Sequence, residues 1–485
     1  MTAPVLVRTP LARRPLAVLG GAVFLLFLVT SAGFGYTDDE LYFLSAGRHL
    51  DWGYADQPPL VPLLAHLADS IAPHSLIVLR LPSTIAVTAG VLVTALIARE
   101  LGGGTRAQLV AAACYAISPL IVADGHHLDT TSLDWALWTV ALWLLVRWNR
   151  TRDDRLLLAI GVVTAVALQA KFLIVFLWLA VLIGVLISGP RELVRRPMLW
   201  AGAGIALLSV LPGLWWQAHH GWPQLEMGAV LAEEAGGRGG RVGFLAFVVV
   251  YAGLVGGILF VLGVIRLFQG PHRYLGWTAV VLITGLLALG QQPYYVAGIF
   301  PVCWAAAAVS PRWRWTTTAP AFAVSALLII RGLLPFPPTG PAPDTYVMNN
   351  VSDDFPAVVP AVTDAYARLS PSEKDDLVLM AGSSGYAGAL EQFGQNLPPV
   401  YCYFRGSWYF GAPPEGTRRV LYVGEVPDFL SAEFRQVRQV GVYTDPLGLI
   451  KHPKHATQPL SLLSDPVRPW SQLWPRLRHL EQIGF

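Results

Sequence analysis

Four charged residues beside apolar segments could together carry out a transfer reaction. Asp39 and Glu40 follow the first apolar run, Asp134 lies at the start of a later one, and Lys171 is alone within a long apolar stretch. A carboxylate can accept the proton of an attacking hydroxyl group. A cation can neutralise a departing phosphate group. If the fold gathers these residues near one membrane face, they suit transfer between a lipid phosphate and a hydroxyl acceptor.

Each of these residues also has a simpler structural interpretation. Asp39 and Glu40 could cap a following helix, because acidic side chains favour the first helical turn. Asp134 could be the N-cap of an apolar helix. Lys171 could extend its ammonium group to the membrane interface. The sequence leaves both interpretations open for all four residues.

The elements that must position these residues are apolar helices. The chain has 485 residues, of which 54% are hydrophobic and only 13% charged. An ordinary soluble domain has roughly 25% charged residues. The net charge of +3 is small and dispersed, which argues against nucleic-acid binding. The composition therefore predicts a polytopic α-helical membrane protein.

Apolar runs of nearly spanning length predict about eleven transmembrane helices. They lie at 16–34, 76–98, 107–123, 133–148, 156–170, 172–188, 198–216, 243–265, 275–290, 294–310 and 316–334. With a cytoplasmic N-terminus, most arginines of this part fall in cytoplasmic loops, as the positive-inside rule requires. Asp39, Asp134 and Lys171 then lie near the opposite face. So do the histidine pairs at 126–127 and 219–220, which could equally be solvated loop residues.

The C-terminal part differs in composition and predicts a second domain. Residues 1–335 form the predicted membrane domain, and residues 336–485, which are richer in charge, form a predicted extracytoplasmic domain. Strands are expected at 377–380, 420–423 and 437–442, and helices at 353–369, 386–394 and 428–436. This alternation predicts a small α/β domain. We expect it to recognise the acceptor or to cover the site.

Ordered motifs in the first part resemble a known family. They are Asp39-Glu40-Leu41-Tyr42-Phe43, Gly53-Tyr54-Ala55-Asp56-Gln57-Pro58-Pro59-Leu60, Leu79-Arg80-Leu81-Pro82, Thr130-Thr131-Ser132-Leu133-Asp134, Leu168-Gln169-Ala170-Lys171, Trp216-Gln217-Ala218-His219-His220 and Gln292-Pro293-Tyr294-Tyr295. The set resembles the GT-C membrane glycosyltransferases of the protein O-mannosyltransferase and aminoarabinose-transferase type, glycosyltransferase family 39. The tail, with Gly382-Ser383-Ser384-Gly385-Tyr386, resembles an actinobacterial branch of that family. A His-Asn pair expected in that branch near Phe404 and Arg405 is missing here.

The resemblance implies inverting transfer of a monosaccharide from a polyprenyl phosphate to an acceptor hydroxyl on the extracytoplasmic face. Asp39 corresponds to the family's catalytic aspartate, with Glu40 and Asp134 as further acids. The implied ligands of the donor phosphate are Lys171 and Arg80, with Arg238 and Arg241 as weaker candidates on a glycine-rich segment. The implied substrate cavity is lined by Asp56, Gln57, His127, His219, Tyr294 and Tyr295.

Several features remain open. Arg80 could be an interfacial anchor, and the glycine-rich segment at 236–241 only a linker. No cofactor is required by the sequence, although a divalent cation held by Asp39 and Glu40 is possible in enzymes of this type. The sugar could be mannose or another pentose or hexose, and the acceptor a glycan, a lipid, a protein or a natural product. A transporter or lipid flippase is the alternative function, but the ionisable residues gather toward one face and no internal repeat is apparent.

Overall fold

The computed structural model describes residues 9–33, 35–236, 240–309, 317–333, 355–444 and 457–481. These form two compact units. The first contains Met1–Thr30, Arg80–His220 and Gly228–Leu334, and the second contains Ser31–Leu79, Gly221–Met227 and Pro335–Phe485. The predicted boundary at 335–336 thus lies beside the start of the last segment of the second unit. The second unit also includes residues 31–79, which lie within the predicted membrane domain.

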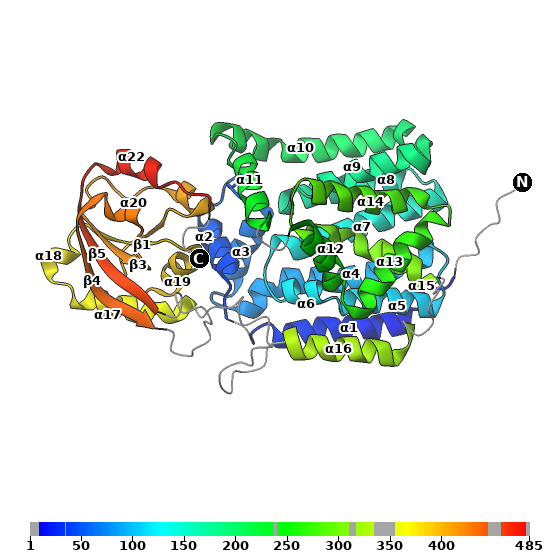
Figure 1. Cartoon of the computed structure of the whole chain (residues 1–485), viewed down its shortest axis with the longest axis horizontal. Coiled ribbons are helices and arrows are strands. Elements are labelled where there is room, and N and C mark those ends of the chain that lie inside the picture. Colours follow the sequence, from blue (N-terminus) through cyan, green and yellow to red (C-terminus); the bar gives the residue numbers. More distant parts are fainter. Residues whose placement is uncertain are drawn as a thin grey trace, which may run out of the picture. The chain divides into compact units, whose positions relative to one another are not determined.

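The first unit is a bundle of helices that run largely alongside one another (Figure 1). Its helices are α1 (Arg13–Thr30), α5 (Thr105–Ala116), α6 (Pro119–Gly125), α7 (Thr130–Thr151), α8 (Arg155–Ala170), α9 (Ile174–Ser188), η1 (Arg191–Arg195), α10 (Pro197–His219), α12 (Gly240–Ala252), α13 (Leu254–Phe268), α14 (Arg273–Ala288), η2 (Pro293–Ile299), α15 (Phe300–Val309) and α16 (Ala319–Leu333). Two more helices, α4 (Leu76–Glu100) and α11 (Pro223–Gly236), cross the division between the units. Large side chains such as Trp138, Trp148 and Trp304 fill its interior.

Small residues allow some of these helices to approach closely. Gly161 of α8 and Gly202 of α10 face each other so tightly that a Cβ on Gly161 would collide with the backbone of Gly202. Gly184 of α9 is equally close to the carbonyl oxygen of Tyr274 in α14. Membrane helices pack mainly through such close backbone approach, because lipid is as apolar as their side chains.

The predicted number of spans is not confirmed. Among the described residues, three helices are long and apolar enough to cross a membrane, and up to five if two bent pairs each count as one span. Helices such as α8, α9 and α14 have 15 or 16 residues, fewer than the about 20 that a bilayer core needs. The spans predicted at 107–123 and 243–265 are each divided into two helices. The first bends by 58° before Pro119, and the second by 110° at Gly253, whose φ is +87°.

The second unit joins two short helices to an α/β domain. The helices are α2 (Asp38–Arg48) and α3 (Leu60–Ile71), which lie between the first two predicted spans. The rest comprises η5 (Phe355–Ala357), α17 (Val358–Arg368), α18 (Pro371–Lys374), β1 (Leu377–Ala381), α19 (Ser384–Phe393), β2 (Val400–Cys402), η6 (Arg405–Phe410), β3 (Arg419–Val423), α20 (Asp428–Ser431), β4 (Phe434–Thr444), β5 (Thr457–Pro466), α22 (Trp470–Leu473) and η7 (Trp474–Leu477).

A five-stranded sheet in the order β2-β1-β3-β5-β4 is the core of this domain. Strands β1, β2 and β3 are parallel, and β5 is antiparallel to both of its neighbours. Helices α17 and α19 cover one face, and α20 and α22 cover the other (Figure 1). The expected α/β domain and its three strands are confirmed. The helix predicted at 428–436 is wrong, because α20 ends at Ser431 and the edge strand β4 begins at Phe434.

Candidate active site

The acidic residues Asp39 and Glu40 at the start of α2 lie in different environments. Thr37 is the N-cap, and its hydroxyl accepts a hydrogen bond from the backbone N–H of Glu40 at 3.2 Å. The Glu40 carboxylate in turn accepts the N–H of Thr37 at 3.1 Å, which completes a capping box. Glu40 is fully buried, whereas Asp39 is exposed. The helix therefore uses Glu40 as a structural partner and presents Asp39 to solvent.

The α/β domain contributes to the setting of α2. Ser383 Oγ, at the N-cap of α19, donates a hydrogen bond to Asp38 Oδ1 at 3.5 Å. Along the same helix, Gly388 lies against the Leu41 backbone, and a Cβ there would come within 2.6 Å of the Leu41 carbonyl oxygen. Helices α2 and α19 thus pack directly on each other, so the C-terminal domain fixes the helix that carries Asp39.

Asp56 and Gln57 lie in the connection between α2 and α3, where the Gln57 side chain is buried and Asp56 is half-buried. Asp56 Oδ1 accepts a hydrogen bond from the Tyr42 hydroxyl at 2.7 Å, which ties the connection to α2. Burial raises the pKa of Asp56, while the hydrogen bond from Tyr42 and the nearby Arg405 guanidinium oppose that shift. Arg405 is thus a charged neighbour of Asp56, at the place where the resemblance led us to expect a His-Asn pair.

The backbone and side chain of Arg405 are held so that its guanidinium can interact electrostatically with the Asp56 carboxylate. Its backbone lies in the left-handed region with φ of 47°, and its N–H donates to the carbonyl of His479 at 2.9 Å. Its guanidinium Nε donates to the Leu480 carbonyl at 3.1 Å. No local sequence pattern predicts this position, because the contacts that orient Arg405 come from residues about 75 positions away.

In the first unit, Lys171 is surrounded by polar and aromatic groups. It follows the last residue of α8, and its Nζ donates to Thr131 Oγ1 of α7 at 2.9 Å. The ring centroids of Tyr294 and Tyr295 in η2 lie 5.4 and 5.2 Å from Nζ, within cation–π range. The carboxylates of Asp124, Asp129 and Asp134 interact with it electrostatically. These contacts hold the ammonium in place, which argues against the snorkelling interpretation.

Asp134 is buried in the second turn of α7, which begins at Thr130 with Asp129 as its N-cap. The N-cap interpretation of Asp134 is therefore wrong. Its Oδ1 accepts the indole N–H of Trp138 at 2.9 Å, and its Oδ2 has no hydrogen-bond partner among the described residues. A buried carboxylate oxygen without a partner is energetically costly, which makes Asp134 a candidate for contact with a bound molecule.

Two further predicted residues of this unit are buried in the same part of the bundle. Arg80, on α4, has no exposed surface, which does not fit an interfacial anchor. Its helix is joined to α7 by a hydrogen bond of 2.9 Å from Ser132 Oγ to Ser83 Oγ. His127, between α6 and α7, is also buried. The polar ends of α4, α7 and α8, with η2, thus form one group around Lys171 and Asp134.

The remaining candidates lie apart or cannot be placed. His219 is exposed at the end of α10, where it bonds the Trp215 carbonyl at 2.8 Å and packs against the Trp215 ring. This contact supports the solvated interpretation, since the ring is turned toward its own helix. Arg241 is exposed near the start of α12, and Arg238 lies outside the described residues. Within the described ranges, no three His, Cys, Asp or Glu side chains are grouped as a metal site requires.

Residues 56–216 match the family model described as dolichyl-phosphate-mannose-protein mannosyltransferase. The match includes Asp56, Arg80, Asp134 and Lys171. No protein with a curated description matches the sequence.

The crystal structure of ArnT from Cupriavidus metallidurans bound to undecaprenyl phosphate is 14% identical, with a TM-score of 0.62, over 93% of this chain and 98% of that one. The apo form gives 13% identity, a TM-score of 0.61 and coverage of 92% and 97%. Mycobacterial arabinofuranosyltransferase AftD is 16% identical with a TM-score of 0.49, over 94% of this chain and 42% of that one. The predicted fold class and the predicted resemblance are confirmed. This chain thus has the GT-C fold, which it shares with ArnT, and its residues 56–216 match the mannosyltransferase family model.

Proposed function

We propose that the protein transfers a monosaccharide from a polyprenyl phosphate to the hydroxyl group of an acceptor, with inversion at the sugar's anomeric carbon. The observation that carries this proposal is the cation site at Lys171, held by Thr131, Tyr294 and Tyr295. It occurs in a fold shared with ArnT, which has been solved with undecaprenyl phosphate bound. A lipid phosphate needs such a cation within an otherwise apolar bundle.

In this proposal the donor phosphate binds to Lys171 and Arg80. Their positive charge stabilises the phosphate as the bond between the anomeric carbon and the phosphate oxygen breaks. Polyprenyl phosphate leaves with the bonding electron pair. Tyr294 and Tyr295 hold the Lys171 ammonium. In the proposal they also contact the donor, together with the buried residues His127 and Asp134. Arg238 and Arg241 are weaker candidates for the same phosphate.

Asp39 is the proposed general base. Its carboxylate accepts the proton of the acceptor hydroxyl while the oxygen attacks the anomeric carbon from the side opposite the phosphate. One displacement of this kind inverts the configuration. Support comes from the contrast at the start of α2, where Glu40 is buried in the capping box and Asp39 is exposed. Asp56 and Gln57 line the part of the proposed site that binds the acceptor. The proposed reaction uses no cofactor. Treatment with EDTA tests that last point, since an essential divalent cation would make transfer sensitive to it.

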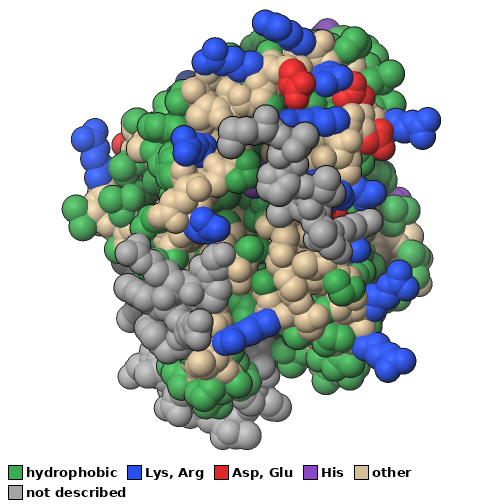
Figure 2. All heavy atoms as spheres, turned by 90° about the vertical axis from the view of Figure 1, so that its right-hand side faces the viewer, with side chains coloured by type: hydrophobic (Ala, Val, Ile, Leu, Met, Phe, Trp, Pro, Cys, Tyr) green, Lys and Arg blue, Asp and Glu red, His purple; other side chains and the backbone are tan. Residues whose placement is uncertain are grey.

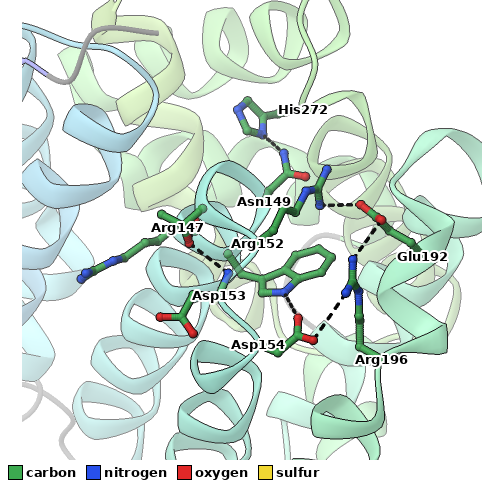
Figure 3. A network of polar contacts seen from close by, with 10 residues as sticks. Arg147, Asn149, Arg152, Asp153, Asp154, Glu192, Arg196 and His272 are labelled. Atoms are coloured by element: carbon green, nitrogen blue, oxygen red, sulfur yellow. Dashed lines mark hydrogen bonds and ion pairs between the residues drawn. The ribbon is translucent and has the colours of Figure 1, made fainter. Parts of the chain in front are cut away.

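We also propose that the basic face of the first unit lies toward the cytoplasm. Figure 2 shows Lys and Arg side chains scattered over this face and acidic ones gathered near one edge. At the ends of α7 and η1, Glu192 bonds Arg152 and Arg196, each at 3.1 Å, and Asp154 bonds Arg196 at 3.5 Å (Figure 3). Asp39 and the C-terminal domain would then be extracytoplasmic. Labelling of single cysteines at positions 152 and 416 in intact cells tests this orientation.

The proposed activity can be tested with purified protein in lipid nanodiscs. A panel of polyprenyl-phosphate sugars is incubated with candidate acceptors, and the release of polyprenyl phosphate and the mass of the product are measured. Asp39→Asn should slow transfer by about 10²–10⁴-fold, the usual contribution of a general base. Asp364→Asn, a matched change at an exposed position of α17, should leave it unchanged. Full activity of Asp39→Asn would show that Asp39 is not the general base. Lipid translocation without a glycosylated product would favour the flippase alternative.

A further inference from the structure

The second unit contains a pocket that the proposed transfer chemistry does not use. Its volume is about 500 Å³, within the range of roughly 300–1,000 Å³ that small-molecule sites occupy. Residues of α2, α19, β2 and η6 line it, among them Ser45, Arg48, His49, Glu391, Tyr401 and Phe410. All of these residues belong to the same compact unit, so the pocket is formed within one body.

The polar side of the pocket is built around Glu391. Ser45 Oγ donates to Glu391 Oε2 at 2.5 Å, and the Arg48 guanidinium donates to the Glu391 carbonyl at 2.8 Å. Arg48 also bonds the side chain of Gln392. These bonds fix a carboxylate and a guanidinium beside each other at the pocket wall. The carboxylate can accept further hydrogen bonds from a ligand, since each of its oxygens has more than one lone pair.

The other side of the pocket is aromatic. The His49 and Phe410 rings stack with centroids 4.7 Å apart and an interplanar angle of 2°. His49 Nδ1 is bonded to the Ser45 carbonyl at 3.0 Å, so this nitrogen carries the proton when the ring is neutral, and Nε2 is then an acceptor. The half-buried ring of Tyr401 adds another flat surface. Hydrogen-bonding groups beside ring faces suit a ligand with hydroxyl groups and a C–H face.

The charges of Glu391 and Arg48 indicate which class of ligand the pocket can bind. An anion would face the Glu391 carboxylate, and a purely apolar ligand would remove Glu391 and Arg48 from water without replacing their hydrogen bonds. A neutral ligand with several hydroxyl groups avoids both costs. The position of the pocket is also informative, because Arg48 is nine residues beyond Asp39 on the same helix, about 14 Å along its axis at 1.5 Å per residue.

We propose that this pocket binds a neutral sugar unit of an acceptor glycan, a few units away from the hydroxyl that reacts. The inference rests on the proposed function and adds the class of acceptor to it. An oligosaccharide reaching from the first turn of α2 to its end would place one ring between Glu391 and Tyr401. Short acceptors would react without this contact, whereas longer ones would gain affinity from it.

Binding can be measured on the full chain in nanodiscs without any donor. Hydrogen–deuterium exchange is followed with neutral tetrasaccharides of mannose, glucose, galactose and arabinose, each compared with its methyl monosaccharide. We expect at least one tetrasaccharide to protect peptides covering 384–393 and 400–410. Glu391→Gln should weaken that tetrasaccharide's binding roughly tenfold or more, the usual effect of losing a hydrogen bond to a charged group. Glu373→Gln, a matched change elsewhere in this unit, should have no effect. Tyr401→Leu is a second test if Glu391→Gln does not fold.

The outcomes separate this inference from the proposed function. In transfer assays, Glu391→Gln should raise KM for the bound tetrasaccharide with kcat unchanged, and should leave monosaccharide acceptors unaffected. Active transfer with no protection of the pocket by any of the tetrasaccharides would overturn the inference and leave the function standing. Protection without transfer to any acceptor would contradict the proposed function instead. An equal loss of activity with short and long acceptors would show that Glu391 acts only through folding, which also overturns the inference.

Discussion

Replacing Lys171 by methionine removes the proposed phosphate-binding charge and keeps most of the side chain's volume. In the folded protein the change deletes the 2.9 Å hydrogen bond to Thr131 and the cation over the rings of Tyr294 and Tyr295. Asp124, Asp129 and Asp134 also lose the positive charge with which they interact. The variant therefore affects both the chemistry and the stability of this part of the bundle, and the two effects must be measured separately.

The two effects are expected to differ in size. Loss of one preorganised group that stabilises charge in a transition state lowers kcat by about 10²–10³-fold. Leaving a buried polar partner unsatisfied costs about 1–3 kcal/mol of folding stability. Thr131→Val is the matched control, because it removes the same hydrogen bond but keeps the ammonium. It should lower the unfolding temperature with a much smaller effect on transfer.

The assay is single-turnover release of polyprenyl phosphate in nanodiscs, with saturating donor and at a temperature well below the unfolding midpoint. Thermal unfolding and monodispersity are measured on the same samples. A folded Lys171→Met protein with the wild-type rate would refute the reasoning, since the phosphate would then be neutralised elsewhere. Equal rate losses in Lys171→Met and Thr131→Val would also refute it, because they would assign Lys171 a structural role.

Two further predictions concern the second unit. Gly388→Ala should lower the unfolding temperature, with a cost of about 1–3 kcal/mol, because its Cβ would come within 2.6 Å of the Leu41 carbonyl. Gly416→Ala, with open space around it, is the control, and equal stability of the two variants would contradict close packing of α2 on α19. Because burial raises the pKa of Asp56 above 3.8, wild-type stability should fall as pH rises from about 4 through the folded-state pKa, relative to Asp56→Asn. Unfolding temperatures measured against pH check this, and parallel curves for the two proteins would contradict it.

Local and compositional signals were sufficient for much of the architecture. The low charge content predicted a membrane protein, and the ordered motifs predicted the GT-C fold that the comparisons support. Apolar periodicity located three strands of the C-terminal sheet. Periodicity did not predict elements whose position depends on contacts with residues far away in the sequence. Strand β5 lies inside the sheet because it pairs with both β3 and β4, and no local pattern predicts those partners. The bends before Pro119 and at Gly253 interrupt runs that are continuously apolar.

The sequence by itself determined which residue types were available for chemistry, because charges are scarce in an apolar chain and their positions are therefore informative. Only the tertiary structure decided how each charge is used. It buried Glu40 in a capping box while leaving Asp39 exposed, and it surrounded Lys171 with groups from α7 and η2. It also packed α19 against α2, more than 300 residues away in sequence. Burial and partner choice depend on contacts between distant segments, and neither composition nor periodicity encodes those contacts.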